Sequence, residues 1–303
     1  MSSPDPLVAH HDRVRVLTEP EWCARERAHA ERMRRWTGPY LRRRARGEKH
    51  PVHDFLFQYY SYRPSQLERW HPGPGVVLAG EAARRFLERP EYHEVPGGVA
   101  LDLAAFDGKR AETARRLLTL LTATAARAPR LNCFGLHEWA MVYRQDADQV
   151  RHNQVPLRLG PAGTDAVVES LPLRCGHYDA FRFFTPPARP LNEPQPTRAT
   201  RPELEQPGCL HANMDLYKAA FRLSPFVPAE LVADCFELAV AIRELDMRAS
   251  PYDLRPLGYA PIPVETPSGR AEYARQQAEF ARRAAPLRHE LVARCHDLPT
   301  LGG

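Results

Sequence analysis

Three segments of this 303-residue chain each combine a thiol with an imidazole. The pairs are Cys133 with His137, Cys175 with His177, and Cys209 with His211. Each pair lies where a loop is expected to meet a regular element, and such junctions commonly present functional groups. The six cysteines include no CxxC pair. We therefore interpret them as free thiols and expect the chemistry to depend on histidines and nearby carboxylates.

The segment 175–184 predicts an acid/base pair. If it forms a strand, Cys175, His177 and Asp179 alternate onto one face. An imidazole beside a carboxylate can transfer a proton or bind a metal ion. His177 and Asp179 are therefore candidate catalytic residues. The competing interpretation is a buried polar pair in the core.

A second set of polar side chains recurs at helical spacing in 209–222. One helix face would carry His211, Asp215, Lys218 and Arg222. His211 and Asp215 are candidate catalytic residues, and Lys218 and Arg222 are candidate substrate-binding cations. A solvated helix face with ordinary ion pairs would show the same spacing.

A third polar cluster is expected where a long helix ends, within 243–253. Asp246 is a candidate catalytic carboxylate, and Arg248 and Asp253 could bind a polar substrate. Helix capping and surface salt bridges would explain these charges equally well.

These residues allow two chemistries. A divalent metal, Zn or Fe, would take two or three imidazoles and a carboxylate. The candidate metal ligands are His137, His177 and His211. The alternative is general acid/base hydrolysis, in which a carboxylate positions water and stabilises an oxocarbenium-like sugar. The candidate carboxylates are Asp179, Asp215 and Asp246.

The charge of the chain makes DNA or a nucleotide a candidate partner. The net charge is +5, and nine arginines fall between Arg25 and Arg46. Tyr62 and Arg63 follow an aromatic run and could stack on a base. A genome composition that favours Arg codons, and an aromatic core, would explain the same features.

The elements that must position these groups are mostly helices. Capping residues and apolar stripes predict helices over roughly 18–46, 81–89, 107–128, 136–144, 210–223, 228–247 and 267–296, the last interrupted near Pro286. Extended segments or strands are expected at 92–103, 155–159 and 173–184. The fold class is therefore mainly α, a single globular helical domain with a few short strands or extended segments in the middle.

Residues 1–17 are expected to form a flexible N-terminal arm, and 18–303 the domain. Within it, the Pro-rich stretch 186–207 is a candidate loop or lid. The sequence contains neither a secretory signal nor an apolar run long enough for a membrane span. We therefore expect a cytoplasmic protein without a membrane partner. The sequence does not indicate the oligomeric state.

Three stretches, 134–143, 206–218 and 244–253, resemble an actinobacterial family commonly labelled 3-methyladenine DNA glycosylase. The resemblance extends from about residue 21 to residue 291. It implies a hydrolase of DNA repair that removes an alkylated purine by cleaving its N-glycosyl bond. Our first hypothesis is therefore a base-excising N-glycosyl hydrolase acting on damaged DNA or a nucleotide. The alternatives are a metal-dependent enzyme acting on a small molecule and a non-catalytic nucleic-acid-binding protein.

Overall fold

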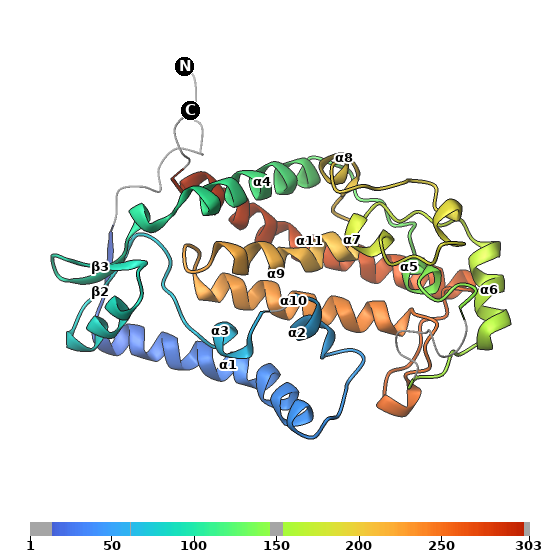
Figure 1. The fold of residues 1–303 in the computed structure, drawn as a ribbon, viewed down its shortest axis with the longest axis horizontal. Coiled ribbons are helices and arrows are strands. Elements are labelled where there is room, and N and C mark those ends of the chain that lie inside the picture. Colours follow the sequence, from blue (N-terminus) through green and yellow to red (C-terminus); the bar gives the residue numbers. More distant parts are fainter. Residues whose placement is uncertain (1–13, 61, 146–153, 300–303) are drawn as a thin grey trace, which may run out of the picture.

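Helices dominate the computed structural model, which describes residues 14–60, 62–145 and 154–299 (Figure 1). The longer helices are α1 (Glu19–Ala45), α4 (Gly108–Ala125), α6 (Gly160–Ser170), α9 (Leu210–Leu223), α10 (Ala229–Arg248) and α11 (Pro267–Asp297). The short α-helices are α2 (Phe55–Tyr59), α3 (Pro64–Leu67), α5 (Leu136–Ala140), α7 (Tyr178–Phe181) and α8 (Arg201–Leu204). Four 3-10 helices cover Glu81–Glu88, Leu103–Ala105, Arg189–Leu191 and Arg255–Leu257. The predicted mainly α, single-domain class is confirmed.

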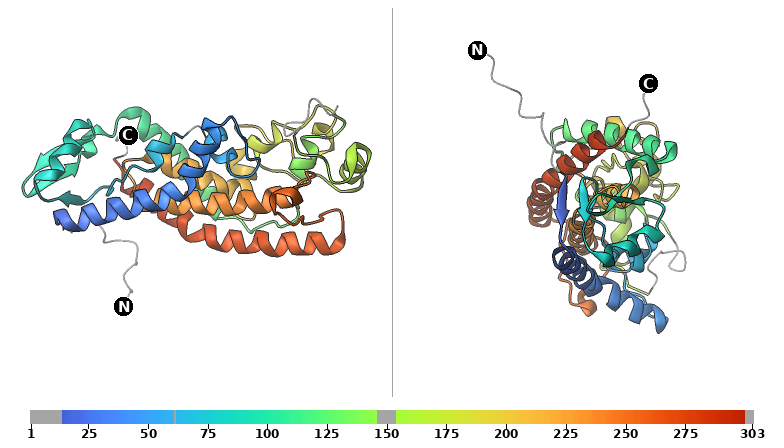
Figure 2. Two further views of the ribbon diagram at one scale, coloured as in Figure 1. Left: turned by 90° about the horizontal axis from the view of Figure 1, so that it is seen from below. Right: turned by 90° about the vertical axis from the view of Figure 1, so that its left-hand side faces the viewer.

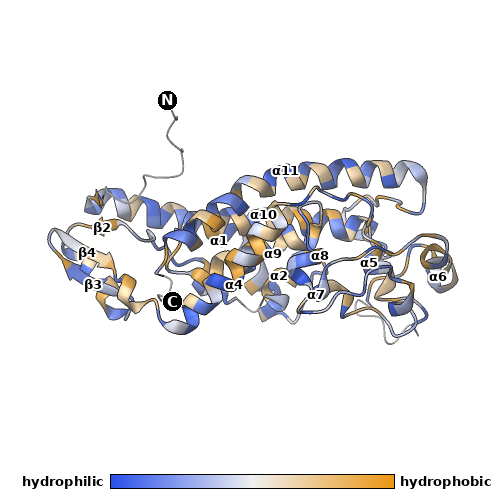
Figure 3. Cartoon of the chain, turned by 90° about the horizontal axis from the view of Figure 1, so that it is seen from above, coloured by the Kyte–Doolittle hydropathy of each residue, from blue (hydrophilic) through white to orange (hydrophobic). Residues whose placement is uncertain are grey.

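The core forms around α9 and α10, which are joined by a short turn into an antiparallel hairpin (Figure 1). Helix α9 also packs against α11 and α4. The predicted apolar stripe of α10 is buried along its length: Leu231, Cys235, Leu238, Ile242 and Leu245. Burial of such a stripe is the main stabilising contribution of a helix. Figure 3 shows that apolar residues are frequent along α9 and α10, the inner helices of the molecule.

A small four-stranded sheet closes one end of the elongated helical body (Figure 2). Its strands are β1 (Arg15–Leu17), β2 (Val76–Leu78), β3 (Tyr92–Val95) and β4 (Gly98–Leu101), in the order β1-β2-β4-β3. Strand β1 pairs in parallel with β2, and the other neighbours are antiparallel. The hairpin of β3 and β4 agrees with the extended segment predicted at 92–103.

Three local predictions differ from the structure. Arg15–Leu17, the end of the predicted arm, forms an edge strand, and residues 1–13 lie outside the described part. The segments 155–159 and 173–184 form no strand; each contributes a single isolated bridge, Leu157 to Tyr252 and Leu173 to Asn192. Among residues 14–60, 62–145 and 154–299, all strands therefore lie before residue 102. Helix α11 continues through Pro286 without interruption.

The Pro-rich stretch 186–207 is ordered by local structure. It contains a 3-10 turn and α8, and the Asn192 side chain bonds the backbone of Cys175 in both directions, at 2.8 and 2.9 Å. In the described part of the chain, no helix has the length and apolar character needed to cross a bilayer.

Candidate metal centre

The three thiol–imidazole segments meet at the end of the body opposite the sheet (Figure 1). Because α9 and α10 are antiparallel, His211 in the first turn of α9 lies near Asp246 in the last turn of α10. The ring centroid of His211 lies 4.4 Å from that of His137 and 5.3 Å from that of His177. Both other candidate histidines therefore lie close to His211.

Two residues of the segment 135–140 fix the position of helix α5. Gly135 precedes it with φ of 71°, and a Cβ atom there would lie 3.2 Å from the Tyr273 ring. Glycine is therefore the residue that suits this left-handed, crowded position. The indole of Trp139 donates a hydrogen bond to the Ala249 carbonyl at 2.9 Å, which ties α5 to the end of α10. These contacts place His137 beside Asp246.

Three of these side chains could hold a metal ion. His137, His211 and Asp246 are buried, and their ligand atoms lie within 4.8 Å of one another. Nε2 of His137 lies 2.8 Å from Oδ1 of Asp246. Ligand atoms bound at about 2.1 Å to one tetrahedral ion lie roughly 3.4 Å apart, so only small side-chain movements separate this geometry from a binding site. The third candidate ligand of this group is Asp246, and the predicted candidate His177 is not part of it.

The environment of Asp246 holds a charged carboxylate far from solvent. A carboxylate at the C-terminal end of a helix is unfavourable on dipole grounds, so it needs cationic partners. Arg243, itself 2% exposed, donates to Oδ2 of Asp246 at 3.1 Å and to Glu138 at 2.7 Å. Burial raises the pKa of Asp246, but His137 and Arg243 outweigh it and the pKa falls well below its usual range. This environment therefore favours the ionised form of Asp246, which is the form that binds a metal ion.

The two imidazoles differ in their preference for protons. Burial, followed by the neighbouring His137, lowers the pKa of His211 well below its ordinary value. Burial also lowers the pKa of His137, but the Asp246 carboxylate raises it more, and the net shift is upward. The lowered pKa favours the neutral form of His211, which is the form that binds a metal ion. The Asp246 carboxylate favours the protonated form of His137, so a metal ion would have to displace that proton.

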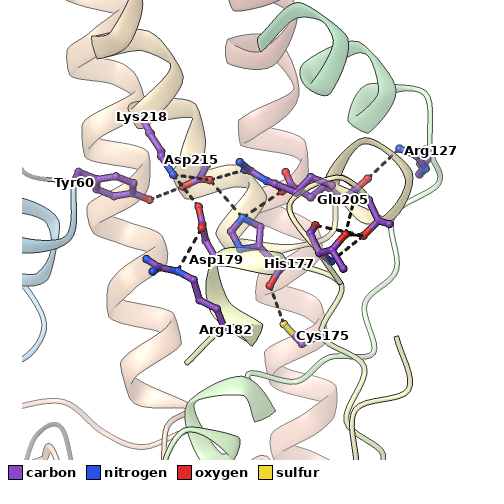
Figure 4. A network of polar contacts seen from close by, with 12 residues as sticks. Tyr60, Arg127, Cys175, His177, Asp179, Arg182, Glu205, Asp215 and Lys218 are labelled. Atoms are coloured by element: carbon purple, nitrogen blue, oxygen red, sulfur yellow. Dashed lines mark hydrogen bonds and ion pairs between the residues drawn. The ribbon is translucent and has the colours of Figure 1, made fainter. Parts of the chain in front are cut away.

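The His177 ring, next to His211, belongs to a second polar network, which Figure 4 shows. Nε2 of His177 lies 3.4 Å from Asp215 and 3.6 Å from Glu205. Arg201 joins the same two carboxylates, at 2.6 Å to Glu205 and 3.1 Å to Asp215. The Tyr60 hydroxyl donates to Asp215 at 3.1 Å. Although burial raises the pKa of Asp215, contacts with His177 and nearby cations hold it well below its usual range.

A pocket of about 500 Å³ opens onto these groups. We call it the site pocket; it is lined by Arg130, Asn132, Cys133, His137, Arg174, Cys175, Gly176, Glu193, Pro194, Leu204, Glu205, Gln206, Cys209, Leu210 and His211. Two of the three candidate ligands face it, so a bound ion would be accessible from it. The exposed guanidinium groups of Arg130 and Arg174 lie among its lining residues.

All three cysteines of the original pairs line the site pocket: Cys133, Cys175 and Cys209. Burial is the main cause of a raised pKa in each, and raises that of Cys175 to about 12. Since the thiolate is the nucleophile, these thiols are held in an unreactive form near neutral pH. The three cysteines therefore line the site pocket without acting as its nucleophiles.

We expect the three pocket thiols to resist alkylation in the folded protein. At pH 8, iodoacetamide should modify them at least about tenfold more slowly than in urea-unfolded protein, because thiolate is scarce. Mass spectrometry of tryptic peptides would measure each rate. Cys23, on α1 outside the pocket, reports whether the reagent reaches the folded protein. Equal rates in folded and unfolded protein would refute the expectation.

The predicted pairing of His177 with Asp179 is wrong, because the segment does not form a strand. His177 precedes the short helix α7, and Asp179 lies in its first turn. Asp179 instead accepts a hydrogen bond from Lys218 at 2.8 Å. Burial raises the pKa of Asp179, but Lys218 lowers it more, so the pKa lies below its ordinary value. Lys218 and Arg222 share the predicted face of α9 but lie beyond the site pocket.

Four predicted substrate-binding residues also lie outside the site pocket. Arg248 donates to the Ala260 carbonyl, and Asp253 pairs with Arg255 on the surface. Tyr62 stacks on the Phe221 ring, with centroids 4.2 Å apart, and Arg63 is exposed at the start of α3. Asp253 therefore forms a salt bridge, as the structural alternative expected, whereas Arg248 binds the backbone of the following loop.

Sequence reasoning missed four residues that shape the site: Glu138, Arg201, Glu205 and Arg243. Two weak signals were available, since Arg201 and Glu205 are four residues apart and Arg243 precedes Asp246 by three. Such spacings usually indicate surface ion pairs. Only the packing of helices shows that Glu138, Glu205 and Arg243 are buried and that Arg201 is mostly covered.

Comparison of the chain with protein-family models, with curated proteins and with solved structures gives no match. The resemblance to the 3-methyladenine DNA glycosylase family therefore stays a prediction.

Proposed function

We propose that this protein is a metal-dependent enzyme that acts on a small molecule, with His137, His211 and Asp246 as metal ligands. The observation that supports it best is the approach of three buried ligand atoms to within 4.8 Å of one another beside a pocket. Two imidazoles and a carboxylate form a ligand set used by catalytic Zn and by non-haem Fe. Three protein ligands leave a coordination position for substrate or water.

The neighbouring network supports a chemical role for the site. An ion at this position would polarise a bound oxygen or activate water. Glu205 is the carboxylate of the second network that lines the site pocket, and Arg201 and His177 lie within ion-pair distance of it. We assign Glu205 the role of accepting a proton from, or orienting, the molecule bound at the ion.

The size and charge of the site pocket favour a small substrate. A volume of about 500 Å³ falls within the range of ordinary ligand pockets. Arg130 at its lining is a candidate to bind an anionic group of that substrate, whereas Arg174 is already paired with Glu193 at 3.0 Å.

We expect untagged protein to contain, or to take up on reconstitution with Zn²⁺ or Fe²⁺, about one metal ion per chain. Inductively coupled plasma mass spectrometry after extensive dialysis would measure it. Because an ion that binds only the folded state stabilises it, the chelated protein should unfold at a lower temperature than the metal-bound protein. A metal content that stays far below one per chain after reconstitution would refute the proposal.

Base excision is our second candidate, supported by the Asp215 carboxylate, which is mostly covered, lies 3.4 Å from Nε2 of His177 and has a lowered pKa. An ionised carboxylate could stabilise an oxocarbenium-like sugar. Asp179 and Asp215 are both neutralised by cations and neither lines the site pocket, so the geometry supports this candidate less well. Release of free base from alkylated DNA by metal-free protein, measured by chromatography, would favour it over the metal-dependent enzyme.

A further inference from the structure

A second pocket, of about 780 Å³, lies on the other side of the Arg201 network from the site pocket. Helices α4, α7, α8 and α9 all contribute to it. We call it the cationic pocket; its lining residues include Arg116, Arg198, Arg201, Lys218, Arg222 and Asp179. Five of these side chains are cationic and one is a carboxylate, although Arg201 is also paired with Glu205 and Asp215.

The cations of this pocket fall into two groups. Arg201 and Lys218 are fixed at its base, since Arg201 pairs with Glu205 and Asp215, and Lys218 with Asp179. Their side chains are each 19% exposed. Lysine and arginine side chains fixed by acidic partners present their remaining N–H groups in defined directions.

The other three arginines keep most of their hydrogen-bonding capacity. Among the residues that the structure describes, neither Arg198 nor Arg222 has a carboxylate within ion-pair distance, and both are exposed. Arg116 has one such partner, Glu112, at 3.5 Å in the preceding turn, where both side chains are solvated. Exposed pairs of this kind contribute little, so the guanidinium of Arg116 can bind another anion.

We propose that the cationic pocket binds a phosphorylated small molecule, with Arg116, Arg198 and Arg222 bound to its phosphoryl oxygens and Lys218 beneath them. Guanidinium groups bind phosphate through paired N–H donors, and several converging arginines are the usual means of holding a doubly charged group. The site needs no metal ion and does not depend on the proposed function.

The shape of the surface favours a small phosphate ester over a polynucleotide. A nucleic-acid backbone requires a continuous basic track. The other arginine-rich region, α1, contributes no residue to the cationic pocket, so its arginines do not continue the lining of this pocket as a track. Three of them are also paired with carboxylates: Arg32 with Asp234 and Glu237, Arg34 with Glu68, and Arg43 with Asp54. The concave cationic pocket instead matches the volume of a single ligand.

Calorimetric titration of the full-length protein with pyrophosphate tests the site. We expect wild-type protein to bind pyrophosphate at low salt, and the affinity to fall with added NaCl. The double variant Arg198→Gln/Arg222→Gln should bind at least about tenfold more weakly, since two charge-assisted contacts are lost. The control Arg275→Gln/Arg282→Gln removes the same net charge from exposed positions of α11 outside the pocket. It should bind as the wild type does.

Three results would overturn the proposal. The first is wild-type protein that does not bind pyrophosphate at low salt. The second is an equal loss of affinity in the control pair, which would show that net charge alone attracts the anion. The third is a single-stranded DNA oligonucleotide that binds more tightly than pyrophosphate and depends on Arg198 and Arg222, which would identify a nucleic-acid surface. Metal content plays no part in these measurements, so they can succeed or fail separately from the proposed function.

Discussion

Replacing Asp246 with Asn should weaken Zn²⁺ binding by more than about 100-fold, because even the partners that orient metal ligands are commonly worth 10–100-fold. The substitution keeps the shape of the side chain but removes its negative charge and its best ligand oxygen. It also leaves Arg243 with Glu138 as its remaining buried carboxylate partner. Competition titration against a chelating dye at pH 7.5 would measure the affinity.

Asp253→Asn is the matched control. Asp253 follows the same helix end but pairs with Arg255 and does not line the site pocket. We expect this variant to bind Zn²⁺ as the wild type does. Circular dichroism would establish that Asp246→Asn is folded before its affinity is interpreted. If folded Asp246→Asn protein bound Zn²⁺ with unchanged affinity, Asp246 would not be a ligand.

Helical periodicity correctly predicted that the polar residues of 211–222 lie on one helix, α9. The structure adds that this row of residues runs from the site pocket to the cationic pocket. His211 is buried at the site pocket, and Arg222 is exposed at the cationic pocket. Between them, Asp215 and Lys218 belong to the second polar network. The four side chains share one face because they belong to one helix, and their spacing in the sequence is enough to predict that face. The participation of Asp246 depends on how α10 packs against α9, and no local spacing contains that information.

Strand alternation failed in 175–184 for a physical reason. Period-two spacing indicates a strand only where a neighbouring strand can pair with it. Here the segment has a single bridge nearby, between Leu173 and Asn192, and the chain turns into α7 directly after His177. His177 therefore faces Asp215 and Glu205, and Asp179 faces Lys218. The residue types were informative, but the partners assigned to them were wrong.

Replacing Arg243 with Met should lower the free energy of unfolding by about 3–5 kcal/mol, the usual cost of removing one member of a buried ion pair. The guanidinium is 2% exposed, lies 2.7 Å from Glu138 and 3.1 Å from Asp246, and covers the Phe55 ring at 4.1 Å. Met fills similar volume, so the loss would come from two carboxylates left with less compensating charge. Urea unfolding at pH 7 of metal-free protein would measure it.

The pH dependence of this effect separates lost charge from lost packing. In the wild type the pKa of Asp246 is depressed, so its ionised form contributes stability above the ordinary carboxyl pKa and loses it as the pH falls. Without Arg243 that contribution shrinks, and protonation relieves the unpaired carboxylates. The stability gap between variant and wild type should therefore narrow below about pH 5. Arg255→Met, which breaks an exposed pair with Asp253, should leave the urea midpoint nearly unchanged. A gap that stayed constant with pH would mean that Arg243 stabilises the fold through packing on Phe55 and not through its charge.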